Sequence, residues 1–236
     1  MKNSIAIIPA RANSKRIKDK NVISFRGMPM IYWAIKVAKE SKCFDRIIVS
    51  TDSKKIAKKA ISFGAEVPFI RPKNISDDHT SSTTVIAHAL NEIIKKQIIP
   101  EYTCCIYPCC PLIEPKDIRK AYKSLKISNV DFIIPLAKYS QPIQRSIELN
   151  ENNKISFVEK KYLFTRTQDL SNRYYDAGQF YIGKSKMWIK NKNIFFNSKG
   201  LVLPEWKAID IDNKEDLERA KIIFDKHIKS NDLNKL

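Results

Sequence analysis

Short apolar runs alternate with helical patterns over residues 1–136, and this alternation limits the possible folds more than any other feature of the sequence. Ser4–Pro9, Arg46–Ser50 and Tyr102–Ile106 are brief runs of the kind found in strands buried on both faces. After the first run, Ile31, Ala34 and neighbouring apolar residues recur at helical spacing. The pattern predicts an α/β fold with one doubly wound, mostly parallel, Rossmann-like sheet and right-handed crossovers. Ligands of such sheets bind beyond the carboxyl ends of the strands.

Local signals place the other elements. Asp52 or Ser53 can cap the helix after the second strand, Gly64 marks the end of that helix, and another helix begins near Ser82. Further helices are expected at residues 115–125 and along the last part of the chain through Leu217 and Phe224. Further strands are expected at residues 66–70, 131–136, 179–182 and 207–211.

Residues 137–176 interrupt the pattern with a polar segment rich in Asn, Gln and Lys. Short extended pieces such as residues 155–158 lie within it. We interpret the segment as an insertion in a single domain that spans residues 1–236. An insertion of this kind is a natural candidate for dimer contacts and for substrate specificity.

The composition is that of a globular protein, with 43% hydrophobic residues among 236. There is no run of about 20 apolar residues as a membrane helix requires. The first apolar run leads directly into a basic loop and does not resemble a cleavable signal. We therefore expect a cytoplasmic protein without a membrane partner.

Five cysteines and a net charge of +18 are the unusual features of the composition. An odd number of cysteines without an export signal favours reduced thiols, and neighbouring strand positions such as Cys104 and Cys105 point to opposite faces. The positive charge is compatible with nucleic acid, but the lysines are dispersed and are not interleaved with aromatic residues. We expect no nucleic-acid partner. A positive field also attracts a nucleoside triphosphate or an anionic sugar.

The loop after the first strand, residues 9–21, reads P-A-R-A-N-S-K-R-I-K-D-K-N. It lacks both the G-x-G-x-x-G and the Walker A patterns. It offers cations instead, which can bind a triphosphate because Arg holds phosphate oxygens in pairs and Lys acts as a mobile point charge. A solvated basic loop is the alternative. The cations are Arg11, Lys15, Arg16, Lys18 and Lys20.

Asp210 and Asp212 form a second candidate site near the other end of the chain. Two residues apart on a strand end, they would direct both carboxylates to one face, and hard oxygen ligands suit Mg²⁺. Asp212 has a structural alternative, since residues 212–215 resemble a helix capping box. Asp210 has no comparable alternative.

Five strings in order along the chain carry a resemblance to a known family. The loop matches P-A-R-x-x-S-K followed by K-N, and the other strings are F-D-R-I-I-V-S-T-D (44–52), G-A-E-V-P-F-I-R-P (64–72), S-D-D-H-T-S-S (76–82) and I-D-I-D (209–212). In these the chain resembles the acylneuraminate cytidylyltransferase family over essentially its whole length. The strings P-I-Q-R-S (142–146) and R-T-Q-D-L (166–170), with Y-Y-D-A-G-Q-F-Y (174–181), are similar to those of the pseudaminic acid enzymes in that family.

Two departures accompany the resemblance. Ala12 and Asn13 replace a common Gly-Gly, and Y-P-C-C-P-L (107–112) replaces Q-P-T-S-P-L of the sialic acid enzymes. The second change removes a glutamine near the nucleotide or sugar, which fits a different sugar.

The resemblance implies an enzyme that joins CTP to a nine-carbon acidic sugar, with Mg²⁺ as cofactor and pyrophosphate as leaving group. The insertion favours a homodimer. It implies catalytic roles for Arg11 and Lys15 and a metal site at Asp210 and Asp212. The nucleotide contacts implied are Ala10, Ser14, Lys20, Asn21, Thr80, Ser81 and Ser82. The sugar contacts implied are Tyr107, Arg145, Arg166, Gln168 and Asp176.

Several of these roles have alternatives. One of residues 80–82 is expected to cap a helix, Arg145 and Arg166 can equally form surface or intersubunit pairs, and His79 and His88 are expected to have no catalytic role. The sugar can be pseudaminic, sialic or legionaminic acid, and a nucleic-acid binder with a borrowed fold is the hypothesis from another class.

Overall fold

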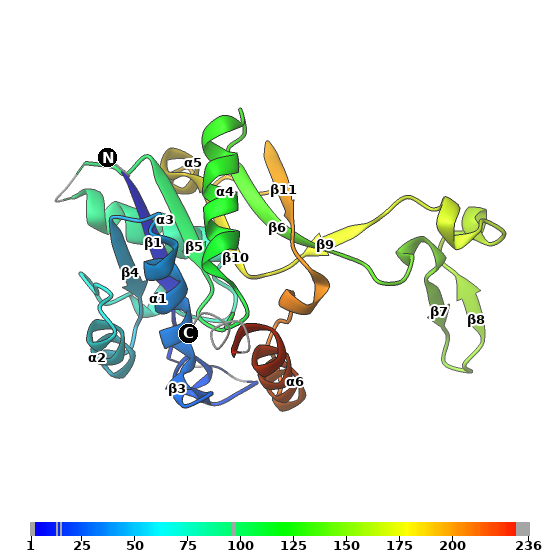
Figure 1. Cartoon of the computed structure of the whole chain (residues 1–236), viewed down its shortest axis with the longest axis horizontal. Helices are drawn as coiled ribbons and strands as arrows, with labels where there is room; N and C mark the ends of the chain where they lie inside the picture. Colours follow the sequence, from blue (N-terminus) through cyan, green and yellow to red (C-terminus); the bar gives the residue numbers. More distant parts are fainter. Residues whose placement is uncertain (1–2, 13, 15, 96–97, 230–236) are drawn as a thin grey trace.

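The structure is a computed structural model that describes residues 3–12, 14, 16–95 and 98–229. Its centre, within this part of the chain, is a seven-stranded sheet in the order β11-β6-β10-β5-β1-β4, with β9 paired to β6 (Figure 1). The strands are β1 (Ser4–Pro9), β4 (Arg46–Ser50), β5 (Tyr102–Ile106), β6 (Phe132–Lys138), β9 (Tyr174–Asp176), β10 (Phe180–Lys184) and β11 (Ser198–Val202).

Most strands of this sheet run in one direction. β1 is parallel to β4 and to β5, and β11 is parallel to β6. β10 lies antiparallel between β5 and β6, so β5 and β6 share a direction, and β9 is antiparallel to β6. The predicted doubly wound, mostly parallel α/β fold is confirmed.

Helices cover both faces of the sheet, and the alternation of side chains along β1 shows why. Ala6 and Ile8 pack on one face with α1 (Met30–Ser41), α2 (Lys54–Ser62) and α4 (Pro115–Ile127). Ile5 and Ile7 pack on the other face with α3 (Ser82–Ile94) and α5 (Ser185–Ile189). A strand with a continuous apolar run such as residues 5–8 can bury both faces, as parallel sheets require.

The cysteines follow the same geometry. Cys104 packs on the face of α1 and Cys105 on the face of α3, as their adjacency in a strand predicts. All five cysteines are buried free thiols. Burial raises the pKa of Cys104 and Cys105, so these thiols stay protonated.

A third apolar cluster lies beside the main sheet, next to the carboxyl end of β1. The small hairpin of β2 (Ser24–Phe25) and β3 (Met28–Pro29) packs against α6 (Lys214–Phe224), where Phe25 and Phe224 meet edge to face. Ile209 and Ile211 are buried in the same cluster. The cluster therefore seats the segment that carries the two late aspartates.

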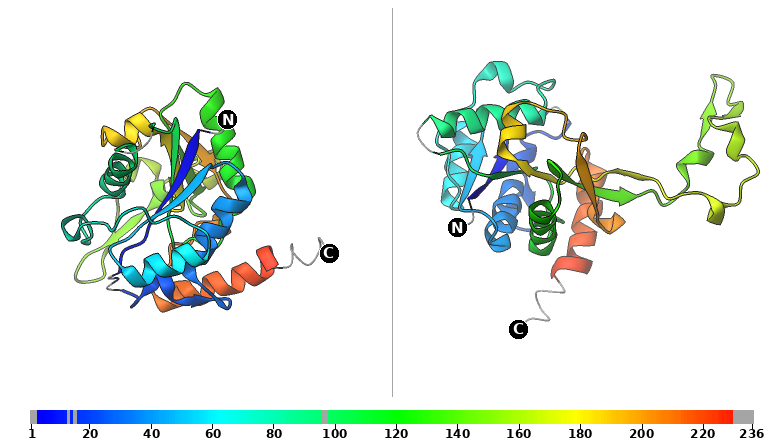
Figure 2. Two further views of the ribbon diagram at one scale, coloured as in Figure 1. Left: turned by 90° about the vertical axis from the view of Figure 1, so that its left-hand side faces the viewer. Right: turned by 90° about the horizontal axis from the view of Figure 1, so that it is seen from above.

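Residues 139–173 form an arm that extends away from the sheet beyond β6 and β9 (Figures 1 and 2). The arm contains a hairpin of β7 (Ile147–Leu149) and β8 (Ile155–Phe157) and three short 3₁₀ helices. It lies within the span where the sequence predicts an insertion. Among the described residues, no helix combines the length and the apolar character needed to cross a membrane.

Two predicted strands are wrong. In residues 66–70, Glu66 makes a single bridge to Ile48, and Pro68 two positions later has no N–H to continue a ladder. Residues 207–211 lie outside the sheet, because the Ile209 carbonyl accepts a hydrogen bond from the Gln179 side chain and Lys207 ends a 3₁₀ helix. β11 was not predicted, since S-K-G-L-V has little strand propensity.

Candidate active site

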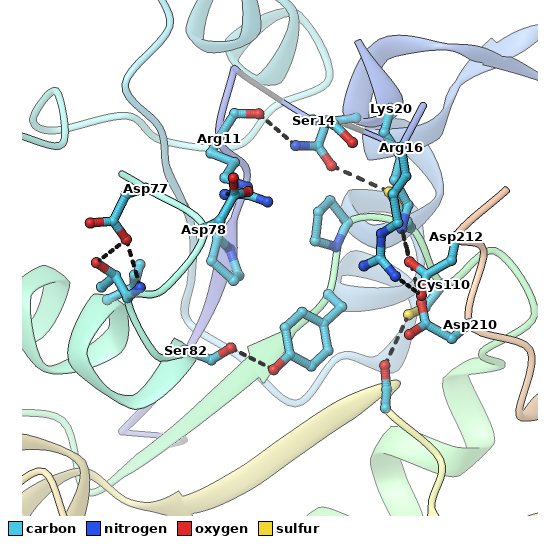
Figure 3. A pocket seen from close by; sticks show the side chains of 18 of the residues that line it. Arg11, Ser14, Arg16, Lys20, Asp77, Asp78, Ser82, Cys110, Asp210 and Asp212 are labelled. Carbon is cyan, nitrogen blue, oxygen red and sulfur yellow. Dashed lines mark hydrogen bonds and ion pairs between the residues drawn. The ribbon is translucent and has the colours of Figure 1, made fainter. Parts of the chain in front are cut away.

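A cavity of about 840 Å³ opens at the carboxyl ends of β1 and β5 (Figure 3). The chain turns from β1 to β4 on one side of β1 and reaches β5 on its other side. This reversal is the switch point at which doubly wound sheets bind ligands. The amino end of β10 and the segment that precedes α6 complete the walls.

The loop after β1 is tied to its surroundings at several points. The Ala10 N–H donates to the Ser50 carbonyl at 2.9 Å, and the Ala12 N–H donates to Asp52 Oδ1 at 2.7 Å. Asn21 Nδ2 donates to the Arg11 carbonyl at 2.8 Å. The loop is therefore fixed by Asp52 and Asn21, and Ala10 is buried beneath it and does not line the cavity.

Five of the predicted loop residues line the cavity, whereas Lys18 does not; the five are Arg11, Ser14, Arg16, Lys20 and Asn21. Lys15 lies outside the described residues. Arg11 forms an ion pair with Asp78, across the cavity from Lys20 (Figure 3). The cations therefore stand on two sides of one hollow.

The two late aspartates meet the same loop. Arg16 and Lys20 both pair with Asp212, Lys20 Nζ lying 3.2 Å from its Oδ1, and Lys20 Nζ is 4.0 Å from Asp210 Oδ1. Both aspartates line the cavity (Figure 3). The fold thus brings together groups from opposite ends of the chain.

The capping alternative for Asp212 is excluded by the local geometry. Asn213 is the N-cap of α6, and its side chain accepts from the Asp216 N–H at 2.8 Å. Asp216 completes the capping box by accepting from the Asn213 N–H. The Asp212 side chain is left for the cavity.

The donor set suits a divalent cation. Although the Asp210 carboxylate is open to the cavity, the surrounding protein atoms and the neighbouring Asp212 carboxylate raise the pKa of Asp210. A cation between two such oxygens would relieve their repulsion, and carboxylate oxygens are the ligands that Mg²⁺ takes.

Replacement of Asp210 by Asn is expected to stabilise the metal-free protein. Since folding raises the pKa of Asp210, the ionised side chain destabilises the fold at neutral pH and not in acid, where it is protonated. The expected rise in Tm is small, because the Asp210 side chain is 70% exposed and solvent screens its charge. Thermal unfolding in a chelator at pH 7 measures it, and the gain should shrink as the pH falls. A lower Tm for the variant at pH 7 would contradict this electrostatic account.

The turn before α3 forms another wall. Thr80 and Ser82 line the cavity, whereas the exposed Ser81 caps α3 by accepting from the Thr84 N–H at 3.1 Å. Asp77 Oδ1 accepts from the N–H and hydroxyl of Thr80, which fixes the turn. His79 does not line the cavity. His88 lies within α3 and packs edge to face on Phe69.

Arg71 is a site residue that the sequence analysis missed. It is only 4% exposed, lines the cavity, and donates from Nε to Ser76 Oγ at 3.1 Å. Its backbone N–H donates to the Thr51 carbonyl. The string at residues 64–72 contained it, but nothing in its local pattern separated it from a surface arginine.

A second hollow of about 460 Å³ adjoins the first and shares Ser82, Tyr107 and Tyr181 with it. The hydroxyls of Ser82 and Tyr107 lie 2.5 Å apart, and Tyr181 Oη donates to Asp176 Oδ2 at 2.5 Å. Burial raises the pKa of both tyrosines, so their hydroxyls stay protonated. The predicted residues Tyr107 and Asp176 therefore lie on the cavity wall.

The remaining predicted residues, Arg145, Arg166 and Gln168, lie on the arm and do not line the cavity of their own chain. Arg166 Nε donates to Asp169 Oδ2 at 2.7 Å, and Arg145 reaches the Thr167 hydroxyl at 3.5 Å. Within one chain, the two arginines therefore pair with neighbours on the arm.

A doubly wound sheet whose switch-point cavity combines a cationic loop with paired carboxylates has the charges that suit a nucleoside triphosphate and a divalent cation. Residues 5–230 match the family described as cytidylyltransferase. The chain belongs to this cytidylyltransferase family.

Individual relatives are consistent with this family. The chain is 40% identical over 225 residues to a pseudaminic acid cytidylyltransferase of Campylobacter jejuni, covering 95% of this chain and 97% of that protein. It is 31% identical to a CMP-N,N'-diacetyllegionaminic acid synthase of Legionella pneumophila, covering 90% and 92%. Its fold is similar to that of a CMP:2-keto-3-deoxy-manno-octonic acid synthetase complexed with CTP, with a TM-score of 0.69, 16% identity, and 95% and 99% of the two chains covered.

Proposed function

We propose that the protein transfers CMP from CTP to pseudaminic acid, a nine-carbon acidic sugar, and releases pyrophosphate. The observation that carries the proposal is the convergence of the cationic loop with Asp210 and Asp212 in one cavity. The similarity over 95% of the chain to a pseudaminic acid cytidylyltransferase supports the choice of sugar.

The reaction follows from the charges around the cavity. The anomeric hydroxyl oxygen of the sugar bonds to the α-phosphorus of CTP, the bond from that phosphorus to the β-bridging oxygen breaks, and the hydroxyl proton passes to solvent. Such a transfer needs positioning and charge stabilisation more than covalent chemistry. In this proposal Arg11 stabilises charge near the reacting phosphorus, and Lys15, Lys20 and the Ser14 hydroxyl hold the leaving pyrophosphate.

Asp210 and Asp212 would hold the metal cofactor, which we propose to be Mg²⁺. When bound, the ion neutralises phosphate oxygens and makes the phosphorus more electrophilic. Lys20 and Arg16 already balance the two carboxylates, so these side chains can move to phosphate oxygens when the cation takes their place. Asn21 keeps the loop in place through the Arg11 carbonyl.

The cytosine base of CTP would lie against the turn before α3. Thr80 and Ser82 offer hydroxyls there, and Arg71 offers a buried guanidinium whose pKa is lowered by burial. Ser81 caps the helix, so its contribution to the base is indirect.

The sugar would occupy the second hollow beside the triphosphate, with Tyr107 and the Tyr181–Asp176 pair at the boundary. Arg145, Arg166 and Gln168 can reach a sugar only in the cavity of another copy, because the arm carries them away from their own (Figure 1). We therefore place these contacts in a homodimer.

Exposed apolar residues on the arm support the dimer. Phe164 is 94% exposed, and Leu149 and Ile155 are exposed on the β7–β8 hairpin. Such residues together mark a contact surface.

Phe164→Asp combined with Leu149→Asp is expected to yield monomers, because charges would replace the apolar contacts of the interface. Light scattering coupled to gel filtration measures the mass. Ile127→Asp is the matched control, since Ile127 is 75% exposed at the end of α4, away from the arm. A dimer that persists in the double variant, or a monomeric wild type, would contradict the assignment.

Pyrophosphate release from CTP, UTP and ATP against pseudaminic, legionaminic and sialic acids tests the function. The expected result is release with CTP and pseudaminic acid that depends on a divalent cation. Preference for legionaminic acid would instead assign this chain the activity named for its Legionella relative. The proposal fails if no sugar acid supports release and the protein instead shifts nucleic acid in a salt-dependent manner.

A further inference from the structure

Lys207 is a fully buried lysine three residues before Asp210. Its side chain is 1% exposed, which is rare for lysine unless the ammonium is paired. Lys207 Nζ lies 2.5 Å from Glu114 Oε2 and 2.5 Å from Asp117 Oδ2. The lysine thus ties the segment that leads to the aspartates to the first turn of α4.

The two carboxylates are themselves fixed by α4. Glu114 and Asp117 form the capping box of this helix, and Asp117 Oδ2 accepts from the Glu114 N–H at 3.1 Å. Carboxylates are favoured at a helix N-terminus, where the helix dipole is positive. The anchor for Lys207 is therefore rigid and is set by the helix.

Gln179 holds the same segment from the other side. Its Nε2 donates to the Ile209 carbonyl at 3.3 Å and to the Ala177 carbonyl at 3.0 Å. Its own backbone carbonyl accepts from the Tyr107 N–H at 3.1 Å. One fully buried residue thus links the cavity wall at Tyr107 to the residue just before Asp210.

Neither residue is what stability alone would select. Buried ion groups are often no more stabilising than apolar side chains of similar size, and Gln179 Oε1 is buried without a hydrogen-bond partner among the described residues. Apolar side chains would fill the same volume without fixing a direction. Hydrogen bonds and ion pairs, in contrast, fix the position of a segment as well as burying it.

We propose that Lys207 and Gln179 are positioning residues that set the place of Asp210 and Asp212 opposite Lys20 and Arg16. This inference rests on the proposed role of the two aspartates in metal binding. Groups that orient metal ligands typically contribute 10–100-fold to metal affinity.

The test is Mn²⁺ binding in the presence of CTP and without sugar, followed by electron paramagnetic resonance. The first variant is Lys207→Met combined with Asp117→Asn. It leaves no buried charge unpaired, because Glu114 keeps Lys116 at 2.9 Å and the amide oxygen introduced by Asp117→Asn can still accept from the Glu114 N–H. We expect Mn²⁺ affinity to fall at least about tenfold with cooperative thermal unfolding retained.

Gln179→Met is the second variant, since it removes the hydrogen bond to Ile209 without changing charge. A fall in Mn²⁺ affinity of at least several-fold is expected. The matched control is Lys184→Met with Asp131→Asn, an ion pair of 3.0 Å at the far end of β10, which should leave Mn²⁺ binding unchanged.

Unchanged Mn²⁺ affinity in the folded Lys207 variant would overturn the inference and leave Lys207 a structural residue. If that variant does not fold, Gln179→Met decides, and unchanged affinity there overturns the inference equally. Asp210→Asn measured in parallel distinguishes a failure of the positioning inference from a failure of the proposed metal site. If it too binds Mn²⁺ normally, the proposed metal site itself is wrong.

Discussion

Arg11→Ala is expected to lower kcat/KM at least about 100-fold, the usual effect of removing a group that stabilises charge in the transition state. Arg11 lines the cavity opposite the Lys20–Asp212 pair and is held there by Asp78. Steady-state pyrophosphate release measures the loss, which should come mainly from a lower kcat. The fold should be unaffected, because Arg11 forms no part of the apolar clusters.

Two controls sharpen this result. Arg119→Ala removes an exposed arginine on α4 and should leave kcat/KM unchanged. Asp78→Asn releases Arg11 from its ion pair without removing the guanidinium, so a far smaller effect is expected. A folded Arg11→Ala protein with near-normal turnover would contradict the role of Arg11.

Asp210→Asn and Asp212→Asn are each expected to raise the Mg²⁺ concentration for half-maximal activity by about tenfold or more. Each change removes a charged oxygen from the pair that faces Lys20. Asp212→Asn should be the more harmful, because Asp212 pairs with both Arg16 and Lys20, whereas Asp210 pairs with Lys20 alone. Mg²⁺ titration of the rate at saturating CTP measures the change.

Glu215→Gln is the matched control for the aspartates. Glu215 is an exposed acid in the first turn of α6, three residues beyond Asp212, and it does not line the cavity. Its Mg²⁺ titration should match that of the wild type. An unchanged Mg²⁺ dependence in both aspartate variants would contradict the proposed metal site.

The sheet could be predicted from the sequence because burial on both faces favours apolar residues at most strand positions. β1, β4 and β5 show this in their apolar middle residues. β11 could not be predicted, because an edge strand is exposed and S-K-G-L-V carries no such signal. Buried and more exposed side chains alternate along residues 207–211 as they do in a strand, but no neighbouring strand among the described residues binds this segment. Instead, Lys207 pairs with Asp117, and the Ile209 carbonyl accepts a hydrogen bond from the Gln179 side chain.

The two ends of the site were predicted because their charge patterns are local. The cationic loop and the aspartate pair are visible as strings, and the loop follows a central strand, where ligands of such sheets bind. The aspartates reach this loop from a segment outside the sheet, which the strings do not indicate. Arg71, Asp52 and Asp78 were missed, because their roles depend on contacts with residues distant in sequence. The direction of the arm was also beyond the sequence, since polar composition does not say whether a segment folds back onto its domain.

Localised backbone cleavage by bound Fe²⁺ shows whether the loop after β1 and the two aspartates share one metal site. Fe²⁺ in place of Mg²⁺, with ascorbate, peroxide and CTP, produces radicals that cut the chain only near the ion. Cuts are expected both at residues 209–213 and within residues 11–21, since Lys20 Nζ lies 3.2 Å from Asp212 Oδ1. Asp210→Asn should weaken both sets of cuts together. Cuts confined to one of these segments, or located on the arm, would show that the loop and the aspartates do not share one metal–triphosphate site.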